Sequence, residues 1–179
     1  MRDISYRVAL GGIVSALCLV TMFLAGILPV LYLLLPGIAG ILLMIIAVEV
    51  STGWAFLTYI AVSLLAMFVT FDKEAALIFI LFFGHYPIIR FYIQKITLKP
   101  FRLFVKLIIF NICILAYFYA TIYILGLKDL IEEFDGLGRY GAYITLVISI
   151  IIFLFYDIDL DFMYKIYRQK LMPKFRKKR

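Results

Sequence analysis

The sequence has few of the residues from which metal centres are built. It contains two cysteines, Cys18 and Cys113, and a single histidine, His85. Both cysteines lie inside apolar segments, where they do not form a metal-type pair and where a disulfide is not expected. Free cysteine usually packs as a small apolar residue, and we interpret both in that way. A metal site is therefore not expected.

Charged residues are also scarce. They make up 16% of the 179 residues, whereas 66% are hydrophobic, and the mean hydropathy is +1.09. Soluble domains are about 45–50% apolar by a similar count, so the composition predicts an integral membrane protein. Six spanning helices of roughly 20 residues would leave no room for a soluble catalytic domain. The apolar run after Arg2 and Arg7 is too long for the core of a signal peptide.

The remaining pattern predicts an all-α bundle of six transmembrane helices in a single domain. The expected helices cover about residues 4–27, 30–50, 54–71, 74–94, 101–125 and 140–165, and a basic tail follows over 166–179. Pro29 and Pro36 bracket a short connection that re-enters the membrane or begins the second helix. Pro87 is expected to kink the fourth helix.

Basic and acidic residues separate onto opposite sides of this bundle. One side carries Arg2, Arg7, Arg90, Lys95, Lys99, Arg102, Lys106 and the basic residues from Lys165 onward. The other side carries Asp72, Glu74, Asp129, Glu132, Glu133 and Asp135, with only Lys73, Lys128 and Arg139 as basic residues. The positive-inside rule then predicts cytoplasmic N and C termini, in a multi-pass protein of the bacterial cytoplasmic membrane. The net charge of +7 reflects this topology and not nucleic-acid binding. The tail either contacts anionic lipid headgroups or holds the topology.

Polar side chains at membrane depth are costly and are therefore candidate functional groups. We expect an outward-facing substrate cavity lined by His85, Asn111, Tyr117 and Thr145, with Asp72 and Glu74 in its lid. The alternative for the four membrane residues is that they form hydrogen bonds between helices. The alternative for the lid is that Asp72 caps the fourth helix and Glu74 lies in its first turn.

Asp157 and Asp161 are four residues apart on the last helix and so share a face near the inner boundary. Such a pair suggests a metal or an acid–base site, but no cluster of histidine or cysteine accompanies it. The denser acidic motif of small membrane phosphotransferases is also missing. We expect ion pairs with Arg90, Lys95 or nearby basic residues, and neither enzymatic activity nor a cofactor.

The first helix carries a face of small residues in "VALGGIVSAL", formed by Ala9, Gly12 and Ala16. Such a face allows close packing of another helix. With this face, its length, six expected helices and cytoplasmic termini, the chain resembles the S component of energy-coupling factor (ECF) vitamin transporters. In that family an Ala-xxx-Ala motif on the first helix contacts the coupling subunit, and Gly12 and Ala16 match its spacing.

The resemblance implies a subunit that binds a vitamin or related small molecule from outside and docks on a membrane coupling subunit driven by two ATPases. A second hypothesis is a small membrane scaffold that recruits partners through its helix faces and basic tail. A third is an intramembrane enzyme that uses His85 or the Asp157 and Asp161 pair.

Overall fold

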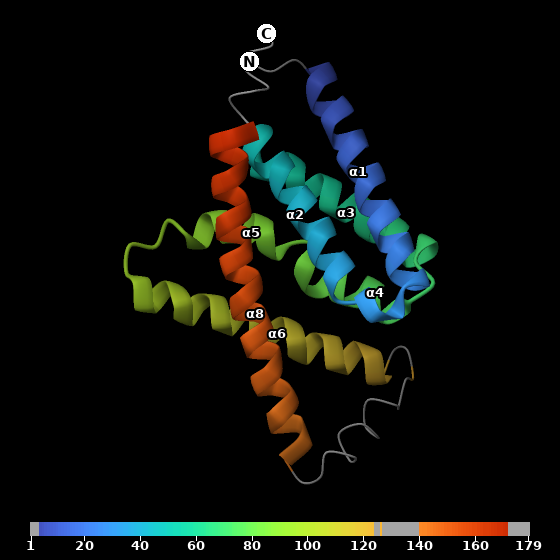
Figure 1. Ribbon diagram of the computed structural model, residues 1–179, viewed down its shortest axis with the longest axis vertical. Helices are drawn as coiled ribbons and strands as arrows, with labels where there is room; N and C mark the ends of the chain where they lie inside the picture. The colour runs from blue at the N-terminus through green and yellow to red at the C-terminus, as the bar shows by residue number, and fades with distance from the viewer. Residues whose placement is uncertain (1–3, 124–125, 127–139, 172–179) are drawn as a thin grey trace.

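The computed structural model describes residues 4–123, 126 and 140–171, and within these ranges the chain is helical without any strand (Figure 1). The elements are α1 (Ile4–Ile27), η1 (Pro29–Leu31), α2 (Leu34–Glu49), α3 (Thr52–Val69), α4 (Lys73–Ile78), η2 (Phe79–Phe83), α5 (Tyr86–Ile93), α6 (Lys99–Tyr123), α8 (Gly141–Ile166) and η4 (Tyr167–Leu171). The expectation of an all-α chain is confirmed for the described residues. The predicted connection between the two prolines contains a short 3-10 turn, η1, which precedes α2.

Among the described residues, five helical segments are long and apolar enough to cross a membrane. They are Ile4–Ile27, Thr52–Val69, Lys73–Ile93, Lys99–Tyr123 and Tyr143–Gln169. Helix α2 is also apolar but has only 16 residues, fewer than the roughly 20 that a perpendicular span needs. The helices are thus those of a membrane protein, while the number of six spans stays a prediction.

The starts of α3 and α4 are fixed by side-chain caps. Ser51 Oγ accepts a hydrogen bond from the backbone N–H of Trp54 at 3.3 Å. Asp72 Oδ1 accepts from the N–H groups of Glu74 and Ala75 at 2.9 and 3.1 Å. Each cap satisfies donors that a helix N-terminus leaves without an intrahelical partner. The interpretation of Asp72 as an N-cap is therefore confirmed.

A π-helical turn, η2, interrupts the long helical segment Lys73–Ile93 in the middle of the bundle. The N–H of Gly84 donates to the carbonyl of Phe79, five residues earlier, at 2.8 Å. The Tyr59 hydroxyl donates to the carbonyl of Ile80 at 2.6 Å. The chain turns at Gly84, and Pro87 follows in the first turn of α5, where its missing N–H costs nothing. The bend predicted near Pro87 is present, and it lies just before the proline.

The helices do not all run alongside one another. Helix α1 packs on α2 and α3 through a face that contains the buried Val14, Cys18, Met22 and Ala25. Helix α6 crosses α8 (Figure 1), and their rings meet where Phe110 stacks on Phe153 with centroids 4.6 Å apart.

The start of α1 and the end of η4 lie at the same end of the molecule (Figure 1). There the Tyr167 hydroxyl donates to Glu49 Oε1, at the end of α2, at 2.8 Å.

The orientation in the membrane can be tested by cysteine labelling. The turn before α4 and the turn between α5 and α6 are predicted to face opposite sides, and both Phe71 and Leu98 are exposed there. In a background that carries Cys18→Ala and Cys113→Ser, Phe71→Cys should react in intact cells with an impermeant maleimide. Leu98→Cys should react only after the membrane is opened. The reverse labelling would overturn the predicted orientation.

Candidate functional site

A cavity of about 530 Å³ lies between η2, α6, α8, the start of α4 and the residues that precede α2. This volume is within the range of roughly 300–1,000 Å³ that is typical of small-molecule sites. Helix α6 contributes Phe110, Cys113, Ile114, Tyr117 and Phe118, and α8 contributes Thr145, Ile148, Ser149, Ile152, Phe153 and Tyr156. These positions recur at intervals of three and four, so each helix turns one continuous stripe toward the cavity.

Three aromatic rings, Phe82, Phe110 and Phe153, form one side of the cavity. We call these three residues the aromatic floor. Phe82 meets the other two rings edge to face, with centroids 5.3 and 5.7 Å apart. Tyr86 lies on the far side of Phe82 and stacks on it at 5.0 Å. Because edge-to-face and offset contacts are favourable ring geometries, the floor is a packed apolar surface.

Polar groups gather toward the start of α4, at what we call the acidic end of the cavity, defined as Asp72 and Glu74. Both carboxylate side chains line the cavity and are half-buried. The Tyr117 hydroxyl donates toward Glu74 Oε2 at 3.4 Å. Thr145 and Ser149 line the cavity from α8. The structure thus brings together four of the six predicted substrate-binding residues, namely Asp72, Glu74, Tyr117 and Thr145.

The other two predicted residues do not line the cavity. The His85 ring lies 5.9 Å from the Tyr59 ring, and His85 Nε2 is 3.7 Å from Cys113 Sγ. His85 therefore lies behind Cys113, which does line the cavity. Asn111 Nδ2 donates to the carbonyl of Leu107, one turn earlier on the same helix, at 2.8 Å. Neither residue makes a contact that points into the cavity.

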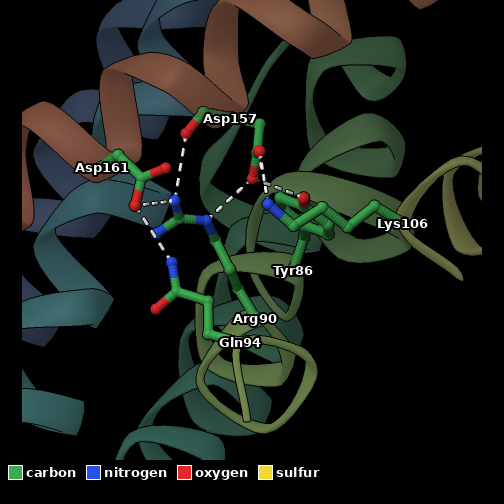
Figure 2. A network of polar contacts seen from close by, with 6 residues as sticks. All are labelled: Tyr86, Arg90, Gln94, Lys106, Asp157 and Asp161. Atoms are coloured by element: carbon green, nitrogen blue, oxygen red, sulfur yellow. Dashed lines mark hydrogen bonds and ion pairs between the residues drawn. The ribbon is translucent and has the colours of Figure 1, made fainter. Parts of the chain in front are cut away.

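Beyond the aromatic floor, a buried network of charged residues joins α5, α6 and α8 (Figure 2). Asp157 is at its centre. One carboxylate oxygen, Oδ1, accepts from the Tyr86 hydroxyl and from Arg90 Nε, both at 2.8 Å. The other oxygen accepts from Lys106 Nζ. Arg90 also pairs with Asp161, to which Gln94 Nε2 donates at 3.0 Å.

The network is balanced in charge, and its centre is buried, whereas the Asp161 side chain at its edge is 47% exposed. Arg90 is 3%, Lys106 6% and Asp157 9% exposed. Two cations and two carboxylates sum to zero, so no charge in the set is left uncompensated. Removing one partner from such a buried set typically costs about 3–5 kcal/mol, because the remaining charge stays buried without its counter-ion.

The expectation that the two aspartates form ion pairs is confirmed for Arg90, and Lys106 is a further partner. Lys95 is not one of the partners found. Its Nζ lies 5.1 Å from the centre of the Tyr92 ring. Lys106 is one of the nearby basic residues expected as partners, although it was not singled out. A lysine eight positions into an apolar helix is itself a signal that a buried carboxylate lies nearby.

The small residues of α1 form a separate exposed feature. Ala9, Gly12 and Ala16 are all exposed, on the side of α1 away from its buried face. A Cβ atom added at Gly12 would meet no other atom within 4 Å. This small-residue face is therefore not used to pack α1 within the described part of the chain.

Comparison with protein-family models, curated proteins and solved structures finds no match to this chain.

The ion network predicts a sharp difference between two neighbouring aspartates. Asp157→Asn leaves Arg90 and Lys106 buried with one carboxylate fewer, and should lower the free energy of unfolding by about 3–5 kcal/mol. Asp159→Asn makes the same change two residues away, outside the network, and should change it by less than about 0.5 kcal/mol. Thermal and denaturant unfolding of the detergent-purified variants measures both. Equal effects would contradict the assigned role of Asp157.

Proposed function

We propose that this chain is the membrane-embedded, substrate-binding subunit of an ECF-type uptake transporter for a vitamin or related small molecule, in the bacterial cytoplasmic membrane. The observation that carries the proposal is the cavity between η2, α6 and α8. Apolar walls with a few polar groups at one end are typical of sites that enclose small molecules.

The exposed face of α1 supports the second half of the proposal, which is docking on a coupling subunit. Helices in a membrane associate through close backbone approach at small residues. Ala9, Gly12 and Ala16 present such a surface, and it is not covered by another part of the described chain. The cavity and this face involve different elements, so ligand binding and docking can be separated by mutation.

In the proposed transporter this chain would bind the substrate and dock, and the two partner ATPases would hydrolyse ATP. The Asp157 and Asp161 pair, which was a candidate for acid–base chemistry, is engaged by Arg90, Lys106 and Gln94.

Docking through α1 can be tested with a matched pair of substitutions. Ala16→Leu places a large side chain on the small-residue face, which would hold a partner helix away. The tagged variant, purified from its host membrane, should retain a coupling subunit and ATPases at a level reduced roughly tenfold or more, which corresponds to about 1.4 kcal/mol.

The control is Ala61→Leu, the same change at an exposed position of α3. It should leave the level of co-purified ATPases unchanged, and both variants should have the unfolding temperature of the wild type. Quantitative mass spectrometry of the purified complexes gives the comparison. If the wild type brings down other proteins and no ATPases, the scaffold hypothesis replaces the transporter.

A further inference from the structure

The charges on the wall of the cavity are of one sign. Asp72 and Glu74 line it, and its lining within the described part of the chain includes no lysine, arginine or histidine. The basic residue between them, Lys73, donates from Nζ to the backbone carbonyls of Met67 and Thr70, at 2.8 and 3.0 Å. Its positive charge is therefore directed at the C-terminal end of α3 and not into the cavity.

The basic residues on the far side of the aromatic floor are also paired with carboxylates outside the cavity. Arg90 pairs with Asp157 and Asp161, and Lys106 pairs with Asp157. This set is neutral as a whole, so it contributes little net potential to the cavity above it. The ionisable side chains that line the cavity, among the described residues, are therefore carboxylates at the acidic end together with tyrosines and a cysteine.

The remaining lining suits an organic ion better than a hydrated metal ion. The faces of phenylalanine and tyrosine rings attract ammonium and guanidinium groups through the ring quadrupole. Phe82, Phe110, Phe153, Tyr117 and Phe118 all line the cavity. A volume of about 530 Å³ is also far larger than a single metal ion requires.

We propose that the ligand of this cavity is a small organic cation. Its ammonium-type group would lie at the acidic end, and its apolar or aromatic body would rest on the aromatic floor. This assignment rests on the proposed function, since it names the substrate class of the same site. Apolar walls lower the effective dielectric constant of a cavity below that of bulk water, so a carboxylate attracts a cation more strongly there and repels an anion to the same degree.

The sign of the cavity potential can be measured without knowing the ligand. Cys113 lines the cavity, whereas Cys18 is fully buried in the core, so a Cys18→Ala background leaves one reporter thiol. The probes are trimethylammonioethyl methanethiosulfonate, which is cationic, and sulfonatoethyl methanethiosulfonate, which is anionic and of similar size. The rate of the cationic reagent with Cys113 is divided by the rate of the anionic reagent, and this ratio is divided by the same ratio for free mercaptoethanol. The normalised ratio should be roughly ten.

Two substitutions should lower this preference without loss of structure. Asp72→Asn keeps a good N-cap and Glu74→Gln keeps an acceptor for the Tyr117 hydroxyl, and each should reduce the normalised ratio roughly threefold or more. Asp159→Asn, which removes a charge outside the cavity lining, should change the ratio much less than either of these substitutions. A second reporter, Ser149→Cys with Cys113→Ser, reads the same cavity from α8 and should give the same order of rates.

A normalised ratio of one or below at both reporters would overturn the cation assignment, and so would a failure of both reagents to reach either thiol. Neither result would bear on docking through α1, which the co-purification of ATPases tests separately. An anionic preference at both reporters together with co-purified ATPases would keep the uptake function and reverse the charge of its substrate.

Discussion

The arrangement of α5, α6 and α8 depends on the carboxylate of Asp157. Within the bundle it compensates both Arg90 and Lys106 and accepts a hydrogen bond from Tyr86. These partners come from α5 and α6, and α6 crosses α8 in place of running along it (Figure 1). Crossing helices share a small contact area, so a specific polar contact can fix where they meet. The stacked pair of Phe110 and Phe153 completes the crossing.

The crossing in turn creates the cavity. Since α6 and α8 separate on one side of their crossing point, space remains between them, and η2 and the start of α4 close it. The π turn of η2 brings Phe82 against Phe110 and Phe153, so the aromatic floor divides the cavity from the ion network. A ligand on the floor would therefore be one ring away from Tyr86, which is hydrogen-bonded to Asp157.

The sequence predicted the helices and part of the site for different physical reasons. Long apolar runs and caps such as Asp72 are local signals, and these predicted elements closely match the helices found. Thr145 and Tyr117 lie on regular helices, where periodicity places a side chain reliably. His85 follows a π turn and a break at Gly84, which change the direction in which later side chains leave the helix. The depth of His85 along the segment was therefore predictable, but the side of the helix on which it lies was not. The partnership of Lys106 with Asp157 depends on a helix crossing that no local pattern specifies.

Identification of the molecules that the protein retains would test the central claim, a small-molecule site in this cavity, most directly. Native mass spectrometry of the wild type should show a bound species of small mass. Ser149→Phe, which fills the cavity from α8, should abolish it, and Ile151→Phe, on the exposed side of the same helix, should keep it. Equal retention by Ser149→Phe and the wild type would contradict a ligand site in this cavity.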